Sequence, residues 1–331
     1  MKIAIVKLSA FGDIVHAMVV LQFIKKYNQA IEIDWLVEES YKELLVNNPD
    51  INKVIVINLK KVKEKKSILL LINELKNARE LGPYDMVIDI QGLVKSALIS
   101  RLIRSSLTIG FDRSSVRESI ASIFYNKTYK YSYDKNVIER NLSLVNFALD
   151  LNYSKKDAHH KLPFLHSNSK YLIPKFSNIK KNILLIPGAS FKSKCYPPTK
   201  FSELTKALDA NFFILSGNSE EKELAMKIKI QSPNVNVLEK LSLNSLISLI
   251  SQVDLVIGSD TGPTHMAWAL CIPSITLFGP TPGKRNTFVT NINRFLESDS
   301  KVNPYKINKN DFSIKNIKVT DIVKISHELL D

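Results

Sequence analysis

The turn after the first apolar segment carries the side chains best suited to take a proton. Ser9, Gly12 and Asp13 lie between residues 2–7, whose apolar run predicts a buried strand, and residues 14–26, whose apolar spacing predicts a helix. Backbone N–H groups are free at such a helix start, and Gly12 lets a ligand approach the backbone closely. Asp13 is interpreted either as a general base or as the N-cap of the helix.

A second cluster suits a phosphate group. Residues 258–265 (GSDTGPTH) follow the apolar run 255–257. Pro263 fits the first turn of a helix, so the N–H groups of that helix and the neighbouring hydroxyls predict an anion site that would take a diphosphate. Asp260 would repel phosphate and is expected to accept hydrogen bonds from sugar hydroxyls, whereas His265 could donate to a phosphate oxygen. The alternative is a capped helix with His265 packed in the core.

Two further loops follow predicted strands and combine glycine with charged side chains. Residues 187–197 (PGASFKSKCYP) contain Gly188, Ser190 and Lys194, which predict a phosphate contact or, alternatively, a solvated basic loop. Residues 217–221 (GNSEE) place a carboxylate where it could hold a ribose diol. The alternative there is an acidic pair that stabilises a helix N-terminus.

Strand and helix patterns alternate twice along the chain, once in each half. This alternation predicts an α/β fold of two doubly wound domains, and the cleft beyond the strand ends is the expected site. A polar stretch with prolines, 152–178, predicts the connection. The predicted domains are 1–160 and 161–331, with the option that the C-terminal helix packs back on the first. The predicted strands are 2–7, 31–37, 54–59, 86–90, 182–186, 212–215, 255–257 and 274–278, and the predicted helices are 14–26, 68–81, 94–103, 136–149, 199–208, 220–230, 243–252, 263–270 and 320–330.

Composition narrows the class of protein. The 331 residues carry 46 Lys and Arg against 32 Asp and Glu, a net charge of +14, so an anionic partner is expected. Aromatic residues are not interleaved with the basic clusters, so a nucleic-acid binder is only an alternative. Two cysteines exclude a disulfide scaffold, and no apolar run or signal-peptide pattern indicates a membrane segment or export, so a cytosolic protein is expected.

Missing motifs narrow the chemistry further. The turn at 9–13 has one glycine where the dinucleotide fingerprint needs three, which disfavours a nicotinamide-dependent oxidoreductase. The chain has no D-x-D, phosphate-loop or zinc-protease motif, and the pair His159 and His160 is interpreted as surface. A site without a metal or cofactor is therefore expected.

Five segments in chain order carry a family resemblance: KLSAFGDIVHAM, VIDIQGLVKSA, RESIASIFYN, GSDTGPTHMAWAL and LFGPTP. With them the chain resembles the ADP-heptose:lipopolysaccharide heptosyltransferases, glycosyltransferase family 9, and among these the enzymes that add the first heptose. The resemblance implies the GT-B fold, two Rossmann-like domains around a cleft. It also implies inverting, metal-independent transfer of L-glycero-D-manno-heptose from ADP-heptose to Kdo of Kdo-lipid A. The alternative is a family member that acts on an already heptosylated core acceptor.

The resemblance also implies roles for individual residues. Asp13 matches the catalytic base, and Lys194 a lysine that contacts phosphate and offsets the charge of the leaving ADP. Glu221 matches the acid that binds ribose, with Glu220 as the competitor. The full donor set is Gly188, Ser190, Lys194, Glu221, Asp260, Thr261, Gly262 and His265, and the acceptor set is Ser9, Gly12, Lys60, Lys61, Lys63, Arg117 and Arg140.

Two features mark the limits of this match. The lysines at 60, 61 and 63 match only by location and charge, and a solvated helix lead-in is their alternative. Ala189-Ser190 and Tyr196 depart from the hydroxyl pair and tryptophan usual in the family. The expected location is the cytoplasmic face of the inner membrane, where basic patches would hold the protein on the anionic leaflet.

Overall fold

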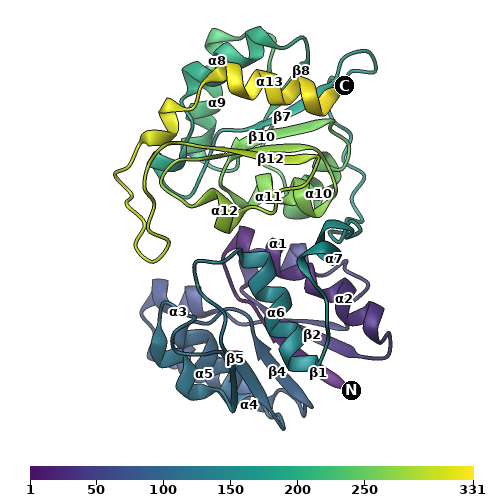
Figure 1. The fold of residues 1–331 in the computed structure, drawn as a ribbon, viewed down its shortest axis with the longest axis vertical. Helices are drawn as coiled ribbons and strands as arrows, with labels where there is room; N and C mark the ends of the chain where they lie inside the picture. The colour runs from purple at the N-terminus through teal and green to yellow at the C-terminus, as the bar shows by residue number, and fades with distance from the viewer. The chain divides into compact units, whose positions relative to one another are not determined.

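Two compact units, Met1–His166 and Ser167–Asp331, make up the chain in a computed structural model that describes residues 1–331. Each unit holds one six-stranded sheet in which every strand pair is parallel (Figure 1). The division falls a few residues after the predicted boundary at 160. None of the helices has the length and apolar character needed to cross a bilayer.

The sheet of the first unit has the strand order β3-β2-β1-β4-β5-β6, with β1 (Lys2–Val6) between β2 (Glu32–Val37) and β4 (Met86–Asp89). The chain therefore winds outward twice from β1, which makes the ends of β1 and β4 the point where ligands of such sheets bind. The other elements are α1 (Phe11–Met18), α2 (Val20–Tyr27), η1 (Glu39–Leu44), β3 (Lys53–Val56), α3 (Leu59–Lys65), α4 (Ile68–Glu80), α5 (Val94–Leu102), β5 (Thr108–Phe111), η2 (Ser119–Phe124), β6 (Lys127–Tyr129), α6 (Val137–Leu149) and α7 (Lys155–His159).

The second unit repeats this order as β9-β8-β7-β10-β11-β12, with β7 (Asn182–Ile186) between β8 (Asn211–Ile214) and β10 (Leu255–Ser259). The C-terminal helix α13 (Val319–Leu330) packs against α8, β10 and β11 of this same unit. The other elements are η3 (Lys192–Lys194), α8 (Pro198–Ala207), α9 (Ser219–Gln231), β9 (Asn236–Val237), α10 (Leu243–Ile250), α11 (Gly262–Ala269), β11 (Ser274–Phe278), α12 (Gly283–Asn286), β12 (Asn293–Glu297) and η4 (Ser313–Asn316).

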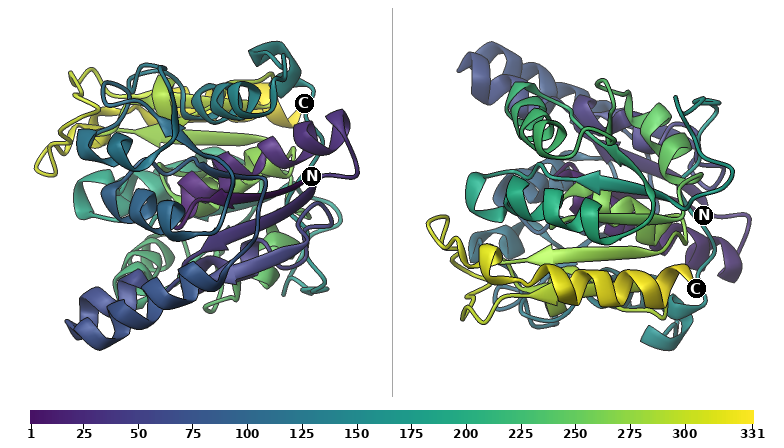
Figure 2. Two further views of the ribbon diagram at one scale, coloured as in Figure 1. Left: turned by 90° about the horizontal axis from the view of Figure 1, so that it is seen from below. Right: turned by 90° about the horizontal axis from the view of Figure 1, so that it is seen from above.

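The central strands are buried because helices cover both faces of each sheet (Figures 1 and 2). The strands β7 (NILLI) and β10 (LVIGS) are buried at every position, as expected of parallel strands that read as continuous apolar runs. Two of the four edge strands, β6 and β9, are only three and two residues long and have no buried residue, so an apolar pattern could not predict them. The predicted helix 14–26 is divided at Val19 into α1 and α2.

Candidate functional site

In the second unit, Glu221 lies over the carboxyl ends of two neighbouring strands. Its Oε2 accepts a hydrogen bond of 2.6 Å from the backbone N–H of Gly217, and the Asn218 side chain caps α9 by accepting from the Glu221 N–H at 2.9 Å. A Cβ atom at Gly188 would lie 2.4 Å from Cγ of Glu221, so only glycine leaves room for this carboxylate. Glu220 is exposed, whereas Glu221 is half-buried. Of the two acids, Glu221 is therefore the one that lies at the strand ends, and its contact with ribose stays a prediction.

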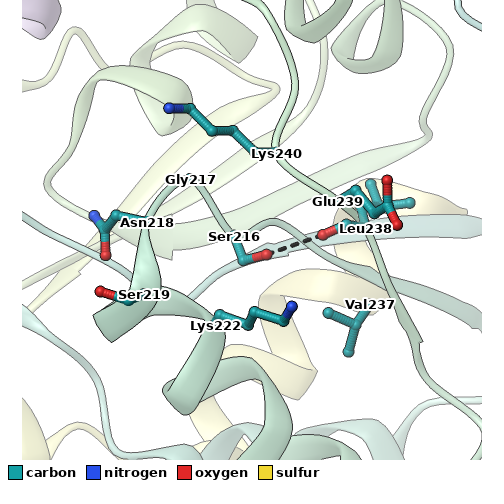
Figure 3. A pocket seen from close by; sticks show the side chains of 9 residues that line it. All are labelled: Ser216, Gly217, Asn218, Ser219, Lys222, Val237, Leu238, Glu239 and Lys240. Atoms are coloured by element: carbon teal, nitrogen blue, oxygen red, sulfur yellow. Dashed lines mark hydrogen bonds between the residues drawn. The ribbon is translucent and has the colours of Figure 1, made fainter.

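A cavity of about 580 Å³ adjoins this carboxylate and shares Gly217 with it. The close-up shows Ser216 donating to the backbone carbonyl of Leu238, a bond of 2.9 Å that ties the loop after β8 to the end of β9 (Figure 3). A volume of this size falls within the usual range of small-molecule sites. The lining is Ser216, Gly217, Asn218, Ser219, Lys222, Val237, Leu238, Glu239 and Lys240.

A buried charge cluster lies at the end of β10, next to the first turn of α11. Nζ of Lys194 lies 2.9 Å from Oδ2 of Asp260, and Nε2 of His265 lies 2.9 Å from Oδ1 of the same carboxylate. All three residues are less than one-tenth exposed. The amide of Asn286 donates to Asp260 Oδ2 at 3.4 Å.

Asp260 stays ionised in this cluster. Burial alone would raise the pKa of its carboxyl, but the Lys194 ammonium and the hydrogen bond from His265 outweigh burial and hold the pKa far below its usual range. Both carboxylate oxygens already have partners, so the structure gives Asp260 the role of orienting Lys194 and His265. The predicted contact of Asp260 with sugar hydroxyls stays a prediction.

The start of α11 supplies the backbone donors expected of an anion site. Thr261 is the N-cap residue, its hydroxyl makes no capping hydrogen bond, and Gly262 and Pro263 open the helix. Thr264 donates to the Ser259 carbonyl at 2.8 Å, which fixes the turn between β10 and α11. Pro263 has no N–H and the His265 N–H donates to the Thr261 carbonyl at 3.2 Å, so the N–H groups of Gly262 and Thr264 are the ones that can receive a negative group here.

In the first unit, the loop after β1 is held from both neighbouring strands. Oε1 of Gln91 accepts from the N–H groups of Leu8 and Ser9 at 3.1 and 3.2 Å, and the Leu8 carbonyl accepts from the N–H of Glu38 at 3.1 Å. Asp13 lies in the first turn of α1 and accepts from the Ala10 N–H at 3.4 Å, while remaining partly exposed. The loop thus presents a carboxylate at the end of the central strand.

A buried carboxylate positions Gln91. Asp89 accepts from the N–H groups of Gln91 and Gly92 and from the hydroxyl of Tyr125, at 2.8, 3.1 and 2.8 Å. Burial raises the pKa of Asp89, and these hydrogen bonds offset part of that rise. Gly92 has φ of +69°, a conformation that favours glycine. Sequence reasoning quoted this DIQG segment for the resemblance but assigned no role to Asp89 or Gln91.

Glu38 is a second residue that sequence reasoning missed. Its carboxylate is buried and accepts from the Lys60 N–H at 3.0 and 3.2 Å, so it holds the start of α3. Burial raises the pKa of Glu38, and the Lys60 N–H lowers it in part. No apolar pattern or motif in the sequence indicated this contact.

The predicted acceptor residues have different environments. Lys60, Lys61 and Lys63 on α3 are exposed, as is Arg117, so their side chains are available to a ligand. Arg140, in contrast, is 5% exposed. Its guanidinium donates to the carbonyls of Tyr131, Ser132 and Ser115 and stacks 4.3 Å from the Phe111 ring. The structure gives Arg140 a bracing role in the first unit, and an acceptor contact through it stays a prediction.

The predicted donor residues gather at one sheet end of the second unit, in two groups. Gly188 and Glu221 meet at the ends of β7 and β8, and Lys194, Asp260 and His265 meet beside α11. Ser190 lies exposed in the loop after β7. In the first unit, Ser9 and Gly12 are half-buried in the loop that carries Asp13.

Comparisons with known proteins agree with this arrangement. The family model for glycosyltransferase family 9 (heptosyltransferase) matches residues 72–311. The lipopolysaccharide heptosyltransferase 1 of Campylobacter coli is 41% identical to the chain, with 99% of each chain covered. The E. coli heptosyltransferase WaaC with ADP is 24% identical and superposes with a TM-score of 0.81 over 99% of each chain. The E. coli ADP-heptose lps heptosyltransferase II is 19% identical, with a TM-score of 0.73 over 100% of this chain and 98% of the other.

These matches confirm both the predicted α/β fold and the predicted family. The two solved neighbours share the whole architecture of two Rossmann-like units known as GT-B, and the first relative matches in sequence from end to end. The chain belongs to glycosyltransferase family 9, the heptosyltransferase family.

Proposed function

We propose that this chain transfers L-glycero-D-manno-heptose from ADP-heptose to Kdo of Kdo-lipid A, with inversion, in synthesis of the lipopolysaccharide inner core. The observation that carries the proposal is the sheet end of the second unit, where the Glu221 carboxylate lies at one pair of strand ends and the buried cluster of Lys194, Asp260 and His265 lies at the end of β10. The relative at 41% identity, matched over 99% of each chain, bears the name lipopolysaccharide heptosyltransferase 1, which supports the proposal.

The donor fits the second unit in three parts. Glu221 would accept hydrogen bonds from the ribose diol, and the adjoining cavity of about 580 Å³ would hold the base. The diphosphate would lie at the first turn of α11, where N–H groups are free to donate. Lys194 would exchange part of its contact with Asp260 for a phosphate oxygen, and Asp260 would keep its side chain aimed at the site.

The chemistry is a single displacement. A Kdo hydroxyl attacks the anomeric carbon of the heptose from the side opposite ADP, and Asp13 takes the hydroxyl proton as the new bond forms. The bond from the anomeric carbon to the phosphate oxygen breaks, and ADP leaves with the electron pair. Lys194 and the helix N-terminus meet the negative charge that develops on ADP.

The acceptor and the membrane fit the first unit. Lys60, Lys61, Lys63 and Arg117 present exposed positive charge that would meet the acidic Kdo sugars and the phosphates of lipid A. A basic surface is also attracted to anionic lipid, which would hold the enzyme at the cytoplasmic face of the inner membrane.

The test is ADP release by purified protein with ADP-heptose and Kdo-lipid A, with each substrate omitted in turn and with EDTA added in a parallel reaction. We expect release that requires both substrates and survives EDTA. Asp13→Asn should bind ADP-heptose normally and lose turnover. Release only with an already heptosylated acceptor would replace the proposed acceptor, and folded protein that does not bind ADP-heptose would contradict the proposed function altogether.

A further inference from the structure

Four large apolar side chains lie exposed within one short stretch of the first unit. At the start of α4, Ile68 is 76% exposed, Leu69 69%, Leu71 37% and Ile72 43%. Single exposed apolar residues are common on soluble proteins, but a cluster of this kind marks a surface that contacts something apolar. In both views of Figure 2 the helices α3 and α4 extend away from the rest of their own unit.

The apolar surface is confined to the N-terminal half of the helix. Ala78 is buried and Leu75 half-buried against the core of the first unit, so they mark the inner face of α4. Ile68 and Ile72 are four residues apart and therefore lie on one face. Beyond them the exposed positions are polar or charged, namely Asn73, Lys76, Asn77, Arg79 and Glu80. The helix thus has an apolar tip rather than an apolar stripe along its length.

Lysines adjoin the apolar tip. Residues 59–66 contain five lysines and one glutamate, and α3, which contacts α4, has no buried residue. Glu64 lies 3.9 Å from Lys60, a pair in which both side chains are more than 60% exposed. Exposed pairs of this kind are weak, so most of the positive charge stays available. An apolar tip and a net positive charge are therefore presented together.

The lysines beside the apolar tip indicate which kind of partner binds it. The centre of a protein–protein interface is depleted in lysine, which disfavours a second copy of the chain or another protein. An anionic bilayer can bind both the apolar side chains and the lysines. Isoleucine and leucine can enter the boundary of the acyl chains, while the lysine ammonium groups stay among the anionic headgroups.

We propose that the α3–α4 tip, residues 60–72, inserts its apolar side chains Ile68, Leu69 and Ile72 into an anionic bilayer. This inference deepens the proposed function, since it rests on a lipid-borne acceptor, and it adds a specific insertion element to the electrostatic attraction. A second exposed apolar pair, Ile120 at 61% and Ile123 at 74%, lies on η2, an element that contacts α5, which in turn contacts α4.

The first experiment measures binding to vesicles of phosphatidylethanolamine with phosphatidylglycerol. The variant is Ile68→Gln/Leu69→Gln/Ile72→Gln, which keeps good helix formers in α4. We expect its vesicle affinity to fall by about tenfold or more, because three side chains lose their contact with the apolar boundary. The matched control Leu172→Gln/Ile179→Gln/Ile230→Gln removes three side chains of the second unit that are 86%, 97% and 75% exposed, and should bind like the wild type.

A second experiment reports insertion directly. The two native tryptophans, Trp35 and Trp268, are buried, so a Leu69→Trp substitution adds one solvent-exposed reporter. We expect its fluorescence to shift to shorter wavelength on anionic vesicles and to be quenched by lipids brominated on the acyl chain. Vesicle binding without quenching, and with unchanged affinity in the triple variant, would show adsorption by charge alone and overturn the proposal.

Two controls separate this inference from its alternatives. Sedimentation without lipid tests whether the tip is a protein interface. If the wild type were a dimer and the triple variant a monomer, while both bound vesicles with the same affinity, the proposal would be wrong. Transfer of heptose to a deacylated, water-soluble Kdo acceptor should be equal in the wild type and the triple variant. If the wild type itself did not transfer heptose to this soluble acceptor, the result would contradict the proposed function and would leave the vesicle experiments to decide on insertion.

Discussion

The carboxylate of Asp260 holds two neighbouring side chains of the second unit, Lys194 and His265, in place. Asp260 is buried, yet its oxygens lie 2.9 Å from Nζ of Lys194 and 2.9 Å from Nε2 of His265, so the buried carboxylate has a polar partner at each oxygen. Removing one member of such a buried pair leaves the other charge uncompensated, which costs more than the pair itself contributes. Lys194 therefore depends on Asp260 for its counter-charge and for its direction.

Asp260→Asn should lower the free energy of unfolding by about 3 kcal/mol at neutral pH, because Lys194 then lacks its counter-charge. The folded pKa of Asp260 is depressed, so its stabilisation is fully present above the ordinary carboxyl pKa of about 4 and is lost as the pH falls through the folded pKa. Urea unfolding between neutral pH and pH 3 should show the gap between wild type and variant narrowing on acidification. Asp299→Asn, at an exposed carboxylate, is the control and should cost little. A gap that widened on acidification would contradict this account.

Glu221→Gln should weaken ADP binding by about tenfold, since a neutral amide replaces a charged acceptor for the ribose hydroxyls. The adjacent Glu220→Gln changes the same charge at an exposed position and should leave the affinity unchanged. Isothermal titration with ADP compares the two. Equal losses in both variants would indicate a general effect of charge rather than a ribose contact.

At the scale of elements, the loop after β1 owes its shape to the two strands beside it. Gln91, after β4, binds the N–H groups of Leu8 and Ser9, and Glu38, after β2, donates its N–H to the Leu8 carbonyl. Because β1 is central in the sheet, both flanking loops can reach it. The start of α1, and with it Asp13, is thereby fixed from two sides.

Gln91→Met keeps the length of the side chain but removes the acceptor for two backbone N–H groups. We expect kcat for heptose transfer to fall about tenfold or more while ADP affinity is unchanged, because a small displacement of Asp13 misaligns the proton acceptor. Gln91→Glu restores acceptor oxygens and should recover a large part of the lost kcat. A variant in which KM rose with kcat unchanged would instead indicate that Gln91 serves acceptor binding.

At the scale of the whole molecule, the two units have sheets with the same strand order. Both sheets wind outward from a central strand. In the second unit the proposed donor residues follow β7 and its neighbours β8 and β10, and in the first unit Asp13 follows β1. The second unit has its own hydrophobic core, to which α13 contributes, so the proposed donor site rests on a framework that runs from β7 to α13.

A fragment of residues 167–331 should therefore fold and bind ADP with an affinity close to that of the full chain. The physical reason is that Glu221, Lys194, Asp260 and His265, with the cavity beside Glu221, all belong to this unit. Circular dichroism would establish folding and titration calorimetry the affinity. A folded fragment without measurable ADP binding would show that the donor site needs residues of the first unit.

Most of the strands and helices could be predicted because they depend on the pattern of apolar residues along short stretches of the sequence. Apolar runs such as 182–186 and helical spacing such as that in 243–252 depend on neighbours in sequence, so the two βα series and the family segments could be found without coordinates. The strands β5, β6, β9 and β12 were not predicted. Of these, β6 and β9 have no buried residue and are held by pairing at the sheet edge rather than by an apolar pattern.

Contacts between distant segments were decided only by the tertiary structure. Gln91 and Leu8 are 83 residues apart, and the Glu38 carboxylate meets the N–H of Lys60 across 22 residues. The sequence alone established the residue types at the strand ends and a family that uses them, since turn chemistry and motifs are local. It could not show that Lys194 and His265 both contact Asp260, that the Arg140 guanidinium donates to backbone carbonyls, or that Glu221 rather than Glu220 faces Gly188. Each of these depends on which buried partner lies within hydrogen-bond reach.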